Sequence, residues 1–189
     1  MATEGLAAAF ATARGVLNNV GADQYDQPTP CASWDVRRLV NHLVGGANWF
    51  AITTNAGASP EQDTTEDTDY TTGDVVAAYD DATAAALAAF AADGAQERMI
   101  TLPFGQFPGA GFMGLATVDQ FTHAWDLAKA TGQSADLNPA LAEQLLAAAQ
   151  AMVSPEFRGP EGAPFGLEVD VDPTACAADR LAGFLGRTV

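Results

Sequence analysis

Apolar residues recur at every third or fourth position along several stretches of this chain, a period typical of helices with one buried face. The first stretch runs from Glu4 to about Val20, where Gly21 is predicted to end it; its apolar face holds Leu6, Phe10, Leu17 and Val20. A turn-rich connection then leads to Ser33, a favourable N-cap residue. The second helix is predicted to stop near residues 55–57, and its apolar face holds Val36, Val40, Leu43, Ala47 and Phe50.

The same period predicts helices over about residues 74–92, 111–131 and 139–152. Gly132 ends the second of these, and Asn138 followed by Pro139 opens the third as a cap and a first-turn proline. Asp172 and Pro173 repeat that signal and predict the start of a closing helix.

Three segments lack the helical period. Residues 58–72 are acidic and threonine-rich and are predicted to form an exposed loop. Residues 98–109 are rich in Pro and Gly, which favours an extended segment or short hairpin across one end of a bundle. Residues 167–171 alternate apolar and acidic side chains, as a short edge strand or extended segment does.

These elements indicate a mainly α protein. We expect a four-helix bundle with an extra short helix and small extended or hairpin segments. The length of 189 residues and the 48% of hydrophobic residues suit one domain over residues 1–189.

Eight basic residues stand against 24 acidic ones, so the formal net charge is −16. Such a surface repels phosphate backbones and anionic lipid, which argues against nucleic-acid and membrane partners. The first residues carry no basic region, and no apolar run is long enough to span a bilayer. We expect a cytoplasmic protein that is a monomer or a homodimer.

The two cysteines, Cys31 and Cys176, are too few for a disulfide framework and are expected to stay reduced. Cys31 precedes a predicted helix start, where the helix dipole lowers a thiol pKa. No histidine lies close to it in sequence, so we predict a small, partly buried structural residue. Neither cysteine has the spacing of a zinc site.

The chain has only two histidines, His42 and His123. His123 lies four residues after Asp119, so both side chains share one helix face and suit a common cation. His42, beside the apolar face of the second helix, is a third candidate ligand, and such a set leaves coordination positions open. The alternative is a surface ion pair between Asp119 and His123, or a histidine with an ordinary hydrogen bond.

Four neighbours make the helix around Asp119 apolar on most of its circumference: Val118, Phe121, Thr122 and Trp125. A helix that is apolar nearly all round is buried. A buried carboxylate without a cation or several donors costs several kcal/mol. A metal held by His42, Asp119 and His123 would remove that cost.

Asp126 lies three residues beyond His123 on roughly the same side. It has three readings: a fourth ligand, an acceptor that fixes the imidazole tautomer or acts as an acid or base, and a partner for an arginine such as Arg180. We favour the acceptor or structural role. Trp34 and Trp125 are predicted to be core residues. Gly45 and Gly46, one turn beyond His42, allow close approach of a substrate or another helix, and simple tight packing explains them equally well.

Two segments carry a family resemblance. Residues 29–42, TPCASWDVRRLVNH, and residues 119–132, DQFTHAWDLAKATG, together resemble the mycothiol-dependent maleylpyruvate isomerase family of the DinB-like metalloenzyme superfamily. Residues 179–187 resemble the end of its short actinobacterial branch. The resemblance spans nearly the whole chain.

The resemblance implies a four-helix bundle that holds a divalent metal through His42, Asp119 and His123. The metal is usually zinc, with nickel or iron(II) as alternatives. The family's characterised isomerase has glutamate where this chain has Asp119, and a further C-terminal domain for which we expect no room here. The implied activity uses a low-molecular-weight thiol, mycothiol, to isomerise an electrophilic small molecule or to transfer sulfur to it.

Two other functions stay open. The same three side chains would suit a metalloenzyme that uses no thiol, either a hydrolase that activates water or an iron(II) enzyme of oxygen chemistry. The bundle would also suit a non-enzymatic protein of the stress response that binds an apolar small molecule.

Overall fold

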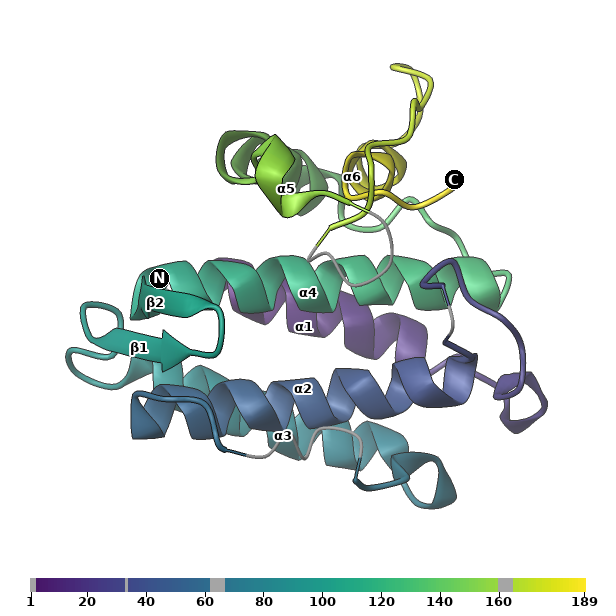
Figure 1. The fold of residues 1–189 in the computed structure, drawn as a ribbon. Coiled ribbons are helices and arrows are strands. Elements are labelled where there is room, and N and C mark those ends of the chain that lie inside the picture. The colour runs from purple at the N-terminus through teal and green to yellow at the C-terminus, as the bar shows by residue number, and fades with distance from the viewer. Residues whose placement is uncertain (1–2, 33, 62–66, 160–164) are drawn as a thin grey trace.

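Four long helices lie side by side and form the bundle that the sequence predicts (Figure 1). The computed structural model describes residues 3–32, 34–61, 67–159 and 165–189. The bundle helices are α1 (Glu4–Leu17), α2 (Val36–Ala56), α3 (Val75–Ala91) and α4 (Gly109–Ala130). Helix α1 packs on α4 and α3, and α2 packs on α3 and α4. The predicted mainly α architecture built on a four-helix bundle is confirmed.

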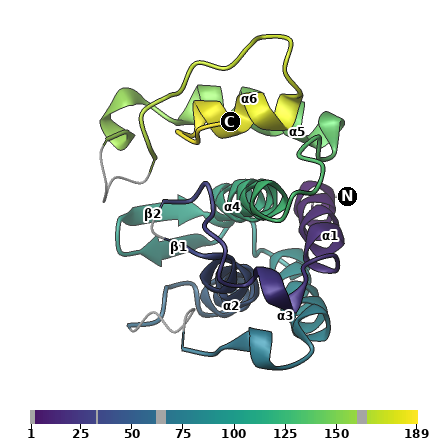
Figure 2. The same ribbon diagram turned by 90° about the vertical axis from the view of Figure 1, so that its right-hand side faces the viewer.

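Two further helices, α5 (Pro139–Met152) and α6 (Ala177–Phe184), form a layer over the outer side of α4 (Figure 2). A second apolar cluster fills this interface, where Phe121 and Trp125 of α4 meet Leu141, Leu145 and Leu181. Helix α4 is therefore buried between two layers, and this explains why its sequence is apolar on most of its circumference. The sequence predicted a helix over residues 139–152 and a closing helix after Asp172 and Pro173, and α5 and α6 correspond to these two.

Side-chain caps fix where three of these helices begin. Asp35 accepts from the amide of Arg38 at 2.8 Å, Asp74 from Ala77 at 3.0 Å and Asn138 from Leu141 at 3.4 Å. The cap predicted for α2 was Ser33, which lies outside the described residues. The observed cap is Asp35, so the helix begins later than predicted.

Two predicted helix boundaries are wrong, the end of α1 and the start of α6. Helix α1 ends at Leu17 and not at Val20, although Val20 still packs against the core. The carboxylate of Asp172 accepts from the amide of Thr174 at 2.8 Å and closes a turn there instead of opening a helix. Helix α6 begins only after Cys176, whose sulfur accepts from the amide of Asp179 at 3.4 Å.

The segments between the helices follow the predicted pattern in part. Residues 98–109 hold an antiparallel hairpin of β1 (Met99–Leu102) and β2 (Gly105–Pro108) at one end of the bundle (Figure 1). The described part of the acidic segment is mostly exposed but includes a short 3-10 helix, η2 (Tyr70–Thr72). Residues 167–171 are not a strand, although the amide of Val169 donates to Gly183 at 2.9 Å. Among the described residues, no helix combines the length and the apolar character that a membrane crossing requires.

Candidate metal centre

The structure brings His42 of α2 together with Asp119 and His123 of α4. The Nε2 atom of His42 lies 3.3 Å from Oδ1 of Asp119, and Nε2 of His123 lies 3.6 Å from the same oxygen. One ligand atom from each of the three residues lies within 4.8 Å of the other two. The imidazole rings meet edge to face, with centroids 4.7 Å apart.

This donor set fits a divalent cation. Ligand atoms about 2.0–2.1 Å from a tetrahedral zinc ion lie roughly 3.3 Å apart. The observed separations of 3.3 and 3.6 Å are close to that value. Two imidazoles with one carboxylate also form a ligand set that catalytic zinc sites use, with further coordination positions left open.

Close contact between α2 and α4 makes this convergence possible. A Cβ atom built on Gly46 would lie 3.4 Å from Nε2 of Gln120 and 3.8 Å from Nε2 of His42. These are ordinary van der Waals distances, so a methyl group would fit at Gly46 and only a longer side chain would meet Gln120 and His42. The role of the glycine pair in close approach stays a prediction.

Asp119 borders a cavity and keeps 27% of its side chain exposed, so it is less buried than the sequence suggested. Burial raises the pKa of this carboxyl, but the charge of His42, the hydrogen bond to it and the charge of His123 lower the pKa to about 2. The group is therefore an ionised carboxylate at neutral pH, the form that binds cations.

Asp126 is fully buried and lies on the other side of the His123 ring. Its Oδ2 atom lies 3.0 Å from Nδ1 of His123. Arg187 donates to the same carboxylate from Nε and from Nη2, each at 3.1 Å. The arginine partner is thus not Arg180, which pairs with Glu143 instead. Burial raises the pKa of Asp126, but the hydrogen bond from His123 and the charge of Arg187 hold it below its usual range.

This arrangement orients His123. An ionised Asp126 accepts a hydrogen bond from Nδ1–H of His123, so that in the neutral ring the lone pair is at Nε2 and faces Asp119. The geometry agrees with the acceptor role favoured for Asp126. It places that carboxylate away from the shared oxygen of Asp119.

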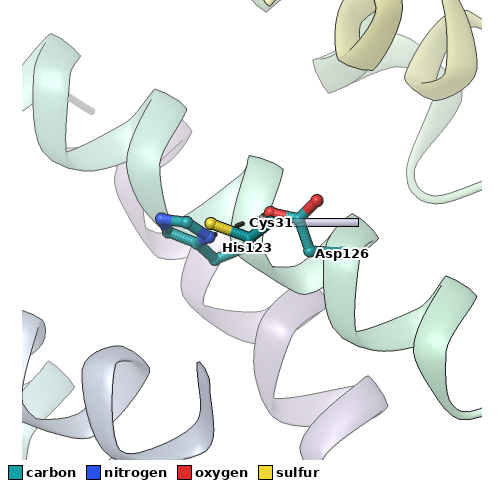
Figure 3. A group of neighbouring side chains, drawn as sticks. All are labelled: Cys31, His123 and Asp126. Carbon is teal, nitrogen blue, oxygen red and sulfur yellow. Dashed lines mark hydrogen bonds and ion pairs between the residues drawn. The ribbon is translucent and has the colours of Figure 1, made fainter. Parts of the chain in front are cut away.

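Cys31 lies beside the same histidine, where sequence distance gave no sign of it. Figure 3 shows its sulfur next to His123 and Asp126, and one ligand atom of each of the three lies within 4.8 Å of the others. Burial raises the pKa of the thiol to about 11, in spite of the opposing charge of Arg187. The partial burial and the raised thiol pKa agree with the small, partly buried structural residue that the sequence predicts, and not with a thiol activated by a helix start. The segment folds back through a hydrogen bond from the amide of Thr29 to Trp34 at 3.2 Å.

Trp34 is partly buried and packs against the bundle core, as predicted, and it also contacts both histidines. Its ring stacks on His123 with centroids 5.3 Å apart and an interplanar angle of 20°, and it lies 4.7 Å from the His42 ring. Trp125 is buried in the core as predicted, and its indole N–H donates to Asp179 at 2.8 Å. The sequence feature that could have identified Trp34 as a residue of the site is its position between Cys31 and His42 in one motif.

A buried hydrogen-bond chain supports Asp119 from the side of α3. The Tyr79 hydroxyl donates to Oε1 of Gln120 at 2.7 Å, and Nε2 of Gln120 lies 3.3 Å from both Oδ2 of Asp119 and the carbonyl of Leu43. Tyr79 and Gln120 are both fully buried. The orientation of Gln120 therefore depends on this phenol.

We expect Tyr79→Phe to lower the free energy of unfolding by about 1–3 kcal/mol, because a buried amide oxygen of Gln120 loses its donor. Urea denaturation followed by circular dichroism measures this. Tyr25→Phe is the matched control, since the Tyr25 hydroxyl has no hydrogen-bond partner among the described residues. Equal effects of the two changes would contradict the role given to Tyr79.

Comparisons with known proteins cover most of the chain. The family described as mycothiol maleylpyruvate isomerase N-terminal domain matches residues 6–128, a range that includes His42, Asp119, His123 and Asp126. Two uncharacterized proteins of Mycobacterium tuberculosis, from two strains, are each 46% identical over 178 residues, or 92% of this chain and 91% of the relative. The crystal structure of the mycothiol-dependent maleylpyruvate isomerase is similar with a TM-score of 0.60 and 16% identity. That similarity covers 78% of this chain and 68% of the other, and it supports the fold.

Proposed function

The chain belongs to the mycothiol maleylpyruvate isomerase N-terminal domain family, and from that premise we propose that it is a metal-dependent enzyme that uses mycothiol. The proposed reaction is isomerisation of an electrophilic small molecule, or transfer of the thiol to it. The observation that carries the proposal is the convergence of two imidazoles and an ionised carboxylate beside a cavity. We also propose that residues 1–189 act as one domain, supported by the packing of α5 and α6 on the bundle.

His42, Asp119 and His123 would hold the metal. When bound, a divalent cation supplies the charge that keeps a coordinating thiol deprotonated at neutral pH. Asp126 keeps the Nδ1 proton of His123 in place, and Arg187 keeps Asp126 ionised. Trp34 packs against both imidazoles and limits their rotation.

The proposed chemistry needs no oxidant. Mycothiol would supply a thiolate that adds to the electrophilic carbon of a conjugated carbonyl compound; the C=C pair would form a new bond to the carbonyl carbon as the C=O π pair moves onto oxygen. For isomerisation, these shifts would reverse after rotation about the former double bond, and the C–S bond would break. For transfer, the enolate carbon would take a proton from water, and the hydroxide left would take up the proton that the thiol had released.

Titration calorimetry tests the proposal. We expect about one divalent ion per chain, and mycothiol binding that weakens at least about tenfold after removal of metal by a chelator, because the thiolate loses its charge partner. S-methyl mycothiol is the matched control ligand, since its sulfur has no proton to lose. Equal mycothiol affinity with and without metal would contradict the proposed role of the metal, and no mycothiol binding in either form would point to a metalloenzyme that uses no thiol.

A further inference from the structure

We propose that the cavity beside the metal centre accepts a flat, apolar electrophile of aromatic size with at most one negative charge, and disfavours dicarboxylates. The inference rests on the proposed function and names its substrate class. The proposed substrate class differs from maleylpyruvate, the small dicarboxylate in the name of the solved relative.

The cavity runs from the metal centre toward the hairpin and has a volume of about 330 Å³. Asp119 and His123 form its wall at the centre. The side chains lining the rest are mostly apolar, among them Trp49, Phe50, Phe112, Leu115, Val118 and Phe165. This volume is at the small end of ligand sites, which suits a substrate of about one ring.

Three aromatic rings make one wall rigid. The Trp49 and Phe50 rings, the Trp49 and Phe112 rings, and the Phe50 and Phe112 rings all meet edge to face, with centroids 5.3–5.4 Å apart. Phe112 is fully buried, so this cluster belongs to the core as well as to the cavity. A ring of the substrate would continue the same edge-to-face contacts.

The charges around the cavity count against dianions. Arg187 is the one cation among the lining residues that the structure describes, and two of its nitrogens are already committed to the buried Asp126. The charge of Asp119 would be compensated by the metal it holds, and that ion would offer a partner to one carboxylate at most. The whole chain has a formal net charge of −16, which disfavours further anions. A second carboxylate on a substrate would therefore find no unpaired cation in this lining.

Thr122 offers a polar contact in this apolar lining. Its hydroxyl oxygen is buried and has no hydrogen-bond partner within the described parts of the chain. Thr117 and Thr131, by contrast, donate to the carbonyl four residues earlier at 2.7 Å. Rotation of the Thr122 hydroxyl toward the cavity would let it donate to a substrate carbonyl, the group that an electrophilic enone carries.

Calorimetry on the metal-loaded protein without thiol tests the proposal with two probes. Benzylideneacetone is a neutral aromatic enone, and maleate is a dicarboxylate. We expect the enone to bind at least about tenfold more tightly than maleate. Equal affinity, or tighter binding of maleate, would overturn the inference.

Two variants locate the site. Leu115→Arg should weaken enone binding at least about tenfold, because it places a charge in the apolar wall. Met113→Arg, on the same helix and also partly buried but not in the lining, is the control and should bind as the wild type does. Thr122→Val should weaken enone binding about fivefold, the value of one neutral hydrogen bond. Unchanged affinity in both Leu115→Arg and Thr122→Val would also overturn the inference.

The substrate-class inference and the proposed thiol-dependent function can fail independently of each other. Enone preference without any mycothiol binding would leave this inference standing and remove the thiol-dependent activity. Metal-dependent mycothiol binding without enone preference would support the thiol-dependent activity and overturn the inference about the substrate class. If Leu115→Arg fails to fold, the comparison of the two probes on the wild type still decides.

Discussion

His123→Ala is expected to reduce the divalent metal bound by the purified protein from about one ion per chain to less than about a tenth of that, because a two-ligand remnant cannot compete with water. His42→Ala and Asp119→Asn should do the same. Elemental analysis by mass spectrometry after gel filtration gives the stoichiometry, and circular dichroism checks that each variant is folded.

Asp126→Asn gives a graded comparison. It leaves the three candidate ligands in place but weakens the acceptor at Nδ1 of His123, so metal affinity should fall about 10- to 100-fold without being lost. Asp67→Asn, an exposed acidic position, is the control and should bind metal normally. Full metal content in His42→Ala would rule out the three-ligand centre, since His42 is its sole ligand from α2.

Arg187→Ala should lower the free energy of unfolding by about 3–5 kcal/mol, because it leaves the buried carboxylate of Asp126 without its cation. Arg187 keeps only 19% of its side chain exposed, and Asp126 keeps none, so water cannot replace the lost contact. Chemical denaturation of the metal-free protein measures the change without a contribution from bound ions.

Arg180→Ala is the matched control for that measurement. Its partner Glu143 keeps 56% of its side chain exposed, so the loss should be about 0–1 kcal/mol. The double variant Arg187→Ala with Asp126→Asn should recover part of the stability, because the uncompensated charge is gone. A cost for Arg187→Ala no larger than that for Arg180→Ala would mean that Asp126 finds another partner.

The helices and the central residues were accessible to sequence reasoning because their signals are local. A period of three to four places the apolar faces, and an Asn-Pro pair marks the start of α5. The four-residue step from Asp119 to His123 puts both on one face of α4 before anything is known of the partners. His42 joined them through its position beside the apolar face of α2.

The surroundings of the centre depend on contacts between distant residues. Cys31 reaches His123 only because the segment before α2 folds back, and Arg187 reaches Asp126 from the end of the chain. Choosing between Arg180 and Arg187 as the partner requires the path of the chain after α6, which no periodicity encodes. The late start of α6 could not be predicted from local sequence either, because Asp172 and Pro173 suit a turn as well as a helix start.

The three tryptophans of the chain occupy three different environments: the stack on the imidazoles at Trp34, the cavity wall at Trp49, and the interface between α4 and α6 at Trp125. The protein thus contains three intrinsic fluorophores, and each lies in a part of the structure where a different change can be followed. Retaining one indole at a time, with phenylalanine at the other two positions, would let emission report separately on the histidine pair, the filling of the cavity and the detachment of the outer helices.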